Sequence, residues 1–182
     1  FMGETIPEND LPLRIVGVSP CFRREVGSHG QSDLGIWRVH QFTKIEQIII
    51  ASPEQSWALQ EELLQNCLDL WDALEMHYEV VNICTGDMGT VAARKYDLEA
   101  WIPGANQYKE IVSCSNCTDY QANRLQIRYG QPGHSGQPIA HTLNSTAVAT
   151  SRALVAIMEQ NQMEDGRVRI PQVLQSLMGG QE

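Results

Sequence analysis

Residues that favour strands are concentrated in several stretches of the chain, and this enrichment predicts strands. Two of them, Arg14–Arg23 and Ile36–Ile50, flank a glycine-rich loop over Gly27–Gly35. Residues 1–12 are polar and contain two prolines, so a connecting segment is expected there, and 130–138 is expected to be a surface loop. Further strand-like runs cover Glu79–Cys84, Tyr96–Ile102 and Tyr108–Ser113.

Helical spacing is clearest over Pro53–Met76, with Ser52 as the expected N-cap and Pro53 at the first helical position. Its apolar stripe consists of Leu59, Leu63, Leu64, Cys67, Leu70, Trp71 and Leu74. A second helix is expected over Ala147–Asn161 and a short third over Pro171–Leu177. This order predicts an α+β fold in one domain over residues 1–182, an antiparallel sheet flanked by helices.

The charge balance narrows the choice of partners. The chain has 22 acidic and 13 basic residues and a formal charge of −9. A surface that grips nucleic acid through its backbone usually has a basic excess, so a dedicated nucleic-acid platform is disfavoured. A local basic pocket can still bind a nucleotide. The longest apolar run, Ile48–Ala51, is too short to span a membrane. The chain starts at Phe1 without a leader pattern, so we expect the native protein to extend upstream.

The cysteines favour a reducing compartment. Their number is odd, at five, and no signal peptide precedes them, so a cytoplasmic location with free thiols is expected. The Cys114-x-x-Cys117 pair has the spacing of half a zinc site, but the sequence supplies no second pair of ligands. Buried, inert thiols are the preferred interpretation.

The most informative segment is the predicted strand from Arg38 to Glu46. Side chains alternate across a strand, so one face presents Arg38, His40, Phe42, Lys44 and Glu46. Arg23 and Glu25 share a face on the partner strand. Arginine matches phosphate oxygens, a ring can stack on a base, and a carboxylate can hold an ammonium group. The alternative is a solvated face with surface ion pairs, and His40 is expected to be a hydrogen-bonded structural residue.

Two further clusters carry candidate chemistry. Glu110 and Ser113 are suitable ligands for Mg²⁺, but positions three apart on a regular strand face opposite ways, so joint ligation requires a bulge or a strand end. Asn144 and Thr146 share a face if extended, and Arg152 near a helix start makes an anion site. The alternatives are a surface glutamate and ordinary helix capping. No phosphate-loop, dinucleotide, nucleophile-elbow or H-E-x-x-H motif is present.

Together these clusters resemble the seryl form of class II aminoacyl-tRNA synthetases. Residues 20–25 and 38–46 (PCFRRE and RVHQFTKIE) resemble motif 2, and 141–152 (HTLNSTAVATSR) resembles motif 3. The segments 97–103, 108–116, 119–122, 159–162 and 165–171 are similar to other parts of that family. The resemblance covers nearly the whole chain, in order. It implies part of the class II catalytic fold.

For ATP, the resemblance implies seven binding residues: Arg23, Glu25, Arg38, Phe42, Glu110, Ser113 and Arg152. Arg23 would hold the α-phosphate and the serine carboxylate, and Glu25 would contact the adenosine or its amino group. Arg38 would bind the γ-phosphate side of a bent ATP. Phe42 would stack on adenine, with Arg152 packing on the other side or reaching phosphate. Arg23 and Arg152 are thereby implied as the catalytic residues.

For serine and metal, the resemblance implies a second set. Glu46 would take the serine ammonium, and Asn144 and Thr146 would line the serine pocket. Glu110 and Ser113 would ligate Mg²⁺, which requires a local irregularity in their strand. The implied reaction joins L-serine to ATP and transfers the seryl group to tRNA(Ser), and by resemblance tRNA(Sec).

The resemblance also implies features outside this chain. Motif 1, used for homodimerisation, the Thr-x-Glu segment that helps bind serine, and the N-terminal tRNA-binding arm are not in the sequence, so this piece is expected to be weak or inactive alone. Leu34 stands where the family often has arginine, and Ser151 where glycine or proline is common. Two alternatives stay open: a ligase charging a non-tRNA acceptor such as a carrier protein, and a non-catalytic paralogue acting as an interaction subunit.

Overall fold

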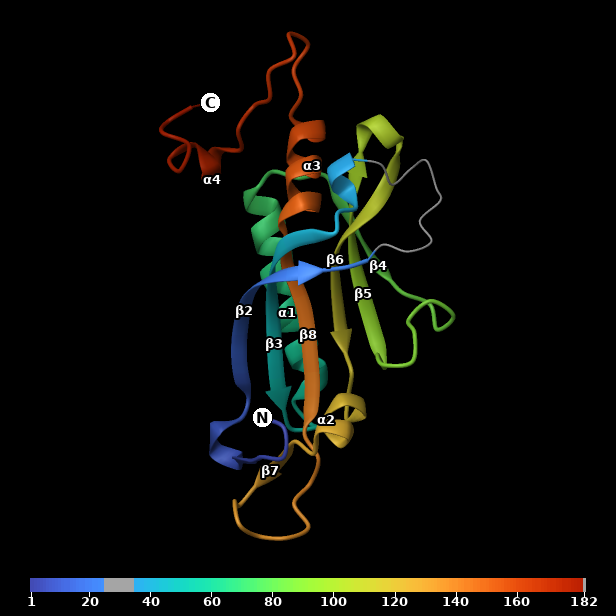
Figure 1. Ribbon diagram of the computed structural model, residues 1–182, viewed down its shortest axis with the longest axis vertical. Helices are drawn as coiled ribbons and strands as arrows, with labels where there is room; N and C mark the ends of the chain where they lie inside the picture. Colours follow the sequence, from blue (N-terminus) through green and yellow to red (C-terminus); the bar gives the residue numbers. More distant parts are fainter. Residues whose placement is uncertain (25–34, 182) are drawn as a thin grey trace.

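The computed structural model describes residues 1–24 and 35–181, built around one six-stranded antiparallel sheet with the strand order β2-β3-β8-β6-β5-β4 (Figure 1). Its strands are β2 (Leu13–Phe22), β3 (Gln41–Ala51), β4 (Tyr78–Asn82), β5 (Arg94–Ile102), β6 (Gln107–Asn116) and β8 (His141–Ala149). A small parallel pair joins β1 (Thr5–Pro7) to β7 (Arg128–Gly130). The predicted α+β class with an antiparallel sheet is confirmed.

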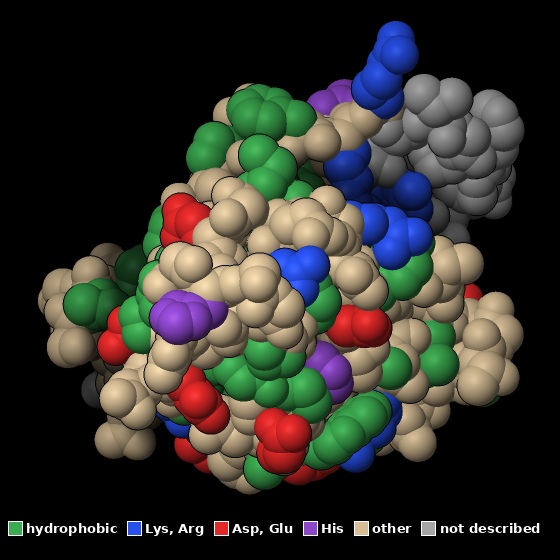
Figure 2. Space-filling view, turned by 90° about the horizontal axis from the view of Figure 1, so that it is seen from below, with side chains coloured by type: hydrophobic (Ala, Val, Ile, Leu, Met, Phe, Trp, Pro, Cys, Tyr) green, Lys and Arg blue, Asp and Glu red, His purple; other side chains and the backbone are tan. Residues whose placement is uncertain are grey.

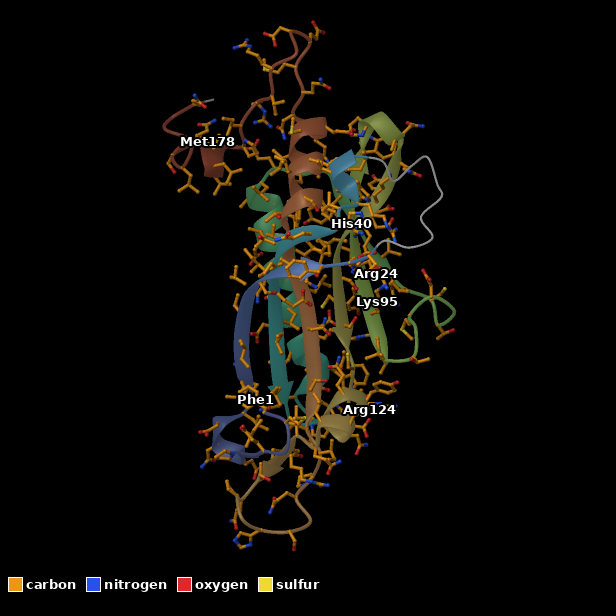
Figure 3. The ribbon with its side chains drawn as sticks, viewed as in Figure 1. Phe1, Arg24, His40, Lys95, Arg124 and Met178 are labelled. Carbon is orange, nitrogen blue, oxygen red and sulfur yellow. The ribbon has the colours of Figure 1, made fainter. Side chains whose placement is uncertain are left out.

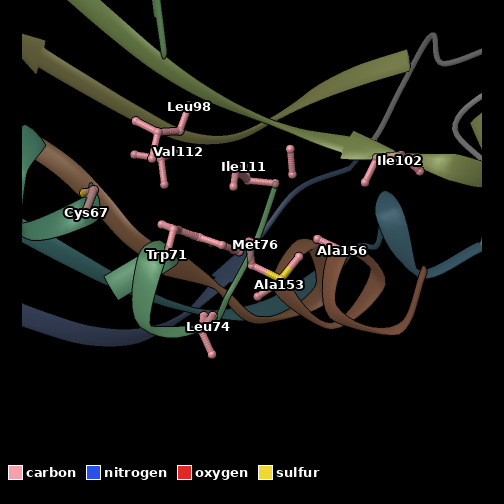
Figure 4. Close-up of a cluster of buried hydrophobic side chains, with 11 residues drawn as sticks. Cys67, Trp71, Leu74, Met76, Leu98, Ile102, Ile111, Val112, Ala153 and Ala156 are labelled. Carbon is pink, nitrogen blue, oxygen red and sulfur yellow. The ribbon is translucent and has the colours of Figure 1, made fainter. Parts of the chain in front are cut away.

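The two long helices, α1 (Ser56–Ala73) and α3 (Thr150–Gln160), pack on one face of this sheet. Two short helices, α2 (Tyr120–Leu125) and α4 (Gln172–Gln175), complete the described helices, and Ala122 of α2 packs with Ile50 on the other face. The two long helices, α1 and α3, share one core with β5 and β6. Figure 4 shows Trp71 and Met76 packed beside Val112, Ile111 and Ala153 in that core. Trp71 and Val112 are fully buried, and burial of a large apolar side chain contributes about 1.5–3 kcal/mol.

The first helix begins later than predicted. Its N-cap is Gln55 and not Ser52, and no side chain caps it. Residues 52–55 form a turn in which the Gln55 N–H donates to the Ser52 carbonyl at 3.2 Å. The buried Ser56 hydroxyl lies 2.8 Å from Nδ1 of His141, which anchors the helix start to β8. A tertiary contact thus replaces the expected local cap.

Other expected boundaries also differ. The strand predicted from Ile36 begins at Gln41, because Gly35–Trp37 forms a 3₁₀ turn. The helix predicted from Ala147 begins at Thr150, because the preceding residues still pair with β3. Residues 1–12 include a short strand, and β7, β8 and α2 were not predicted as elements. No described helix is long and apolar enough to cross a membrane.

The five cysteine thiols are free and range from exposed to fully buried. Cys84 is exposed, whereas Cys114 is fully buried, and burial raises the pKa of Cys114 to about 12. Since the thiolate is the reactive form, we expect iodoacetamide at pH 8 to label Cys84 in the folded protein and Cys114 only after unfolding. Mass spectrometry of tryptic peptides measures this. Comparable labelling of both without denaturant would contradict the core packing.

Candidate functional site

Predicted site residues from separate segments line one cavity of about 140 Å³. It lies where β2 ends, β3 begins and α3 starts. The predicted residues on its wall are Arg23, Arg38, Phe42, Glu110, Thr146 and Arg152. Glu25 and the predicted loop up to Leu34 lie outside the described residues. Trp37 and Lys44 also line the cavity, which therefore combines four cations, two aromatic rings and a carboxylate.

Backbone pairing places Arg23 at the cavity. Phe22 is the last residue of β2 and lies opposite Gln41, so Arg23 comes to lie beside His40. The Arg23 N–H donates to the His40 carbonyl at 2.9 Å, and His40 Nδ1 lies 3.1 Å from the Arg23 carbonyl. Figure 3 shows His40 and Arg24 at this end of the sheet. His40 is thus a structural residue, as expected, and it secures the backbone of Arg23.

Trp37 organises the cationic side of the site. The Arg152 guanidinium lies 5.4 Å from the Trp37 ring centroid, and Lys109 Nζ lies 5.2 Å from it. Such contacts stabilise a cation by about 0.5–1 kcal/mol at exposed sites. Arg152 also donates to the Glu110 carbonyl at 2.8 Å and lies 3.4 Å from the Glu110 carboxylate. An adjoining cavity of about 260 Å³ is lined by these residues and Tyr108.

Trp37 and Lys109 were not among the predicted site residues. Strict alternation placed position 37 on the face opposite Arg38, but the 3₁₀ turn over Gly35–Trp37 breaks that alternation. Trp37 and Arg38 consequently line the same cavities. The first residue of this turn, Gly35 with φ of +81°, was the available signal for an interruption.

Glu46 meets both predicted serine-pocket residues. Asn144 Nδ2 donates to Glu46 Oε1 at 2.9 Å, and the Thr146 hydroxyl donates to Oε2 at 3.0 Å. Lys44 Nζ lies 2.8 Å from the same Oε2. Glu46 lines a larger neighbouring cavity of about 610 Å³ rather than the first, and Lys44 lines both. The Glu46 carboxylate is thus oriented by Asn144, Thr146 and Lys44, at the point where the two cavities adjoin.

A β-bulge in β6 lies between the two predicted metal ligands, Glu110 and Ser113. Leu98 of β5 pairs with Val112, but Glu99 pairs with Glu110, so Ile111 is an extra residue in β6. Ile111 and Val112 are both buried although they are consecutive. The extra residue brings Glu110 and Ser113 onto the same face. The irregularity that the sequence required is present, although Ser113 does not line the cavities described above.

An unpartnered carboxylate oxygen lies close to this bulge. Asp97 is directly opposite Ser113 in the β5–β6 pair and is 5% exposed. Its Oδ2 lies 3.0 Å from Lys95 Nζ, but Oδ1 is buried without a hydrogen-bond partner. Burial and the neighbouring carboxylates Glu79, Asp97 and Glu110 raise the pKa of Glu99. Glu110, Ser113 and Asp97 supply oxygen atoms, the ligand type that a hard divalent cation prefers, but among the described residues no group of three or more His, Cys, Asp and Glu side chains is arranged to hold a metal ion.

Basic side chains are clustered on the surface, although the net charge of the chain is negative. Figure 2 shows Lys and Arg side chains collected toward one side of the molecule, while carboxylates are scattered over the remainder of that view. The field within a cavity depends on nearby charges more than on net charge. Arg23, Arg38 and Arg152 therefore make the first cavity suitable for an anionic ligand.

Comparisons with known proteins agree with this geometry. Residues 1–161 match the tRNA synthetase class II core domain (G, H, P, S and T). A protein of Methanocella arvoryzae named serine--tRNA ligase is 56% identical over 183 aligned residues, which cover all of this chain and 43% of that protein. The chain thus spans less than half the length of this curated relative.

Two solved structures share the fold closely. The seryl-tRNA synthetase of Pyrococcus horikoshii complexed with ATP is 54% identical, with a TM-score of 0.95 over 99% of this chain and 40% of that one. A cytoplasmic serine-tRNA ligase of Naegleria fowleri in complex with AMP is 47% identical, with a TM-score of 0.94 over 100% of this chain and 43% of that one.

Proposed function

The chain belongs to the family of class II tRNA synthetase core domains, and from this premise we propose that it is the C-terminal part of the catalytic domain of a serine–tRNA ligase. The observation that carries the proposal is the Glu46–Asn144–Thr146 cluster placed beside the arginine-lined cavity. An ammonium site next to a phosphate site is what joining an amino acid to ATP requires. The relatives named as serine ligases support the choice of amino acid.

ATP is the proposed ligand of the first cavity. Arg23 holds the α-phosphate and the serine carboxylate, and Arg38 binds the γ-phosphate side. Phe42 stacks on adenine, while Arg152 packs on the other side or reaches phosphate. Glu25, which lies outside the described residues, is proposed to contact the adenosine. The ATP and AMP complexes of the two solved relatives support a nucleotide here.

Serine is proposed to bind across the junction of the two cavities. Its ammonium replaces or joins Lys44 at Glu46, and Asn144 and Thr146 line the pocket for the remainder of the molecule. Selection against alanine would follow because polar groups of the site stay unpaired when the substrate lacks a hydroxyl.

Mg²⁺ is proposed to bind at Glu110 and Ser113. The bulge at Ile111 supports this, because it places both side chains on one face, and the unpartnered Asp97 oxygen nearby supports a cation. A bound Mg²⁺ would neutralise phosphate charge as pyrophosphate forms.

The proposed chemistry needs no nucleophilic side chain from the protein. A carboxylate oxygen of serine attacks the α-phosphorus, the bond to the bridging oxygen breaks, and pyrophosphate leaves. Arg23 and Arg152 stabilise the charge that develops on phosphate. A ribose hydroxyl at the 3′ end of tRNA then attacks the seryl carbonyl, and AMP leaves. Transfer to tRNA(Ser) and tRNA(Sec), homodimerisation and a cytoplasmic location are proposed for the full-length protein.

Exchange of pyrophosphate into ATP tests the proposal directly. The full-length protein should catalyse exchange that depends on serine and on Mg²⁺. Alanine, glycine and threonine should support it at least about a hundredfold less well, because each lacks a partner group or adds bulk. Exchange with glycine or alanine but not serine would overturn the substrate. Parallel assays with tRNA and with a carrier protein identify the acceptor, and no exchange with any amino acid would favour a non-catalytic role.

A further inference from the structure

Polar side chains lie directly behind the Glu46–Thr146 pair, on the helix-covered face of the sheet. Gln47 and Ser145 are opposite each other in the β3–β8 ladder, one residue along from the opposed Glu46 and Thr146. Successive side chains of a strand point to opposite faces, so Gln47 and Ser145 point toward α1 while their neighbours point toward the cavities. Both of these rear side chains contact Cys67 of α1.

Cys67 is the common partner of this rear cluster. Its Sγ lies 3.3 Å from the Ser145 hydroxyl, 3.3 Å from the Thr146 carbonyl oxygen and 3.3 Å from Gln47 Nε2. Cys67 and Ser145 are completely buried. Burial raises the pKa of the Cys67 thiol, so it keeps its proton and can donate to the Thr146 carbonyl. A buried hydrogen-bonded cluster of this kind restricts the backbone that it contacts.

Gln47 extends the cluster along α1. Its Nε2 donates to the Leu63 carbonyl at 3.3 Å, and its Oε1 accepts from Asn66 Nδ2 at 2.8 Å. Gln47 therefore joins β3 to two successive turns of the helix, at Leu63 and at Cys67. These hydrogen bonds fix the position of α1 along its axis relative to Gln47, the residue that follows Glu46.

The strand pairing is irregular at the same point. The β3–β8 register shifts between Ile45 and Glu46, which leaves Ala147 as the extra residue of β8. A bulge disrupts the ladder locally and re-aims the neighbouring side chains. Thr146 directly precedes the extra residue, so the regular ladder alone does not determine its orientation. The hydrogen bond from Cys67 holds its carbonyl from behind.

We propose that Cys67 and Gln47 are positioning residues for the amino-acid site, holding the bulge so that Glu46 and Thr146 aim together at the substrate. This inference rests on the proposed function, since it concerns the same serine pocket. The hydrogen bonds of the cluster join β3, β8 and α1, and none of them involves Arg23, Phe42 or Arg152. Thr146 also lines the first cavity, but Arg23, Phe42 and Arg152, which are proposed to hold ATP there, lie outside the cluster, so the effect is expected on the amino acid and not on ATP.

The test removes the thiol of Cys67 while it keeps the volume of the side chain. Cys67→Val removes the hydrogen bonds at similar volume, whereas Cys67→Ser retains a donor and an acceptor. In the full-length protein, Cys67→Val should raise the KM for serine about three- to tenfold in pyrophosphate exchange, the range expected for one lost hydrogen bond. The KM for ATP should stay within about twofold, and Cys67→Ser should restore most of the serine KM.

A matched control separates positioning from packing. Ile49→Val changes a residue of β3 on the same face as Gln47, 1% exposed, and should leave both KM values unchanged. If Cys67→Val fails to fold, Ser145→Ala removes one hydroxyl of the cluster and should show the same shift in serine KM.

The outcomes distinguish this inference from the proposed function. Equal increases in the KM for serine and ATP, or an unchanged serine KM in both Cys67→Val and Ser145→Ala, would refute the positioning role. Absence of serine-dependent exchange in the unmodified protein would instead refute the proposed function itself.

Discussion

Glu46→Gln is expected to abolish serine activation almost completely while ATP binding persists. The carboxylate is 17% exposed and already accepts hydrogen bonds from Asn144 and Thr146, so a substrate ammonium would meet a desolvated, fixed anion. Removing one partner of a buried ion pair costs about 3–5 kcal/mol. We therefore expect kcat/KM for serine in pyrophosphate exchange to fall at least a hundredfold, roughly 3 kcal/mol.

A second carboxylate provides the control for Glu46→Gln. Glu62 accepts two hydrogen bonds from Arg14, at 2.6 and 2.8 Å, and is more exposed, at 39%. Glu62→Gln should leave exchange unchanged, because an exposed pair contributes at most about 1 kcal/mol to stability. ATP affinity of both variants can be measured by calorimetry with a non-hydrolysable analogue. Loss of ATP binding in Glu46→Gln would show that its assigned role is wrong.

Arg152→Lys should impair ATP use despite retaining the positive charge. The planar guanidinium lies over Trp37 and donates to the Glu110 carbonyl, whereas a lysine ammonium cannot make the same forked contacts. Loss of one preorganised donor to a transition state costs about a hundred- to a thousandfold in rate. We expect that decrease in the exchange rate, together with a higher KM for ATP.

Arg169→Lys is the corresponding control. Arg169 pairs with Glu75 at 2.7 Å and with Asn161 at 2.8 Å, outside the cavities that hold Arg152. It should change neither kinetic constant. If Arg152→Lys exchanges pyrophosphate at the unmodified rate, Arg152 does not contact the reacting phosphate.

Much of the fold follows from local pattern. The strand-forming residues of β2 and the helical stripe of α1 predicted both elements to within a few residues. The spacing of Phe42, Lys44 and Glu46 correctly placed their side chains toward the same side of β3, where each lines one of two adjoining cavities. These properties depend on the chain's own geometry, since alternation is the same wherever a strand lies in the sheet.

The central strand β8 was not predicted as an element, for a physical reason. It lies between β3 and β6, and both of its faces are largely covered, so its sequence does not show a clear alternation. Its alanine-rich end also suits a helix, which led to the early helix start at Ala147. Pairing with β3 continues the strand as far as Ala149, whereas β6 pairs only with Leu143, Asn144 and Ser145.

By itself the sequence determined the α+β class, and it predicted which side chains carry chemistry and that an irregularity is required between Glu110 and Ser113. Only the tertiary structure decided where the two bulges lie, that Trp37 turns into the site, and that Cys67 supports Thr146 from behind. Bulges arise from the pairing of two strands, and contacts across the sheet join residues far apart in the chain, so neither is encoded in a local repeat.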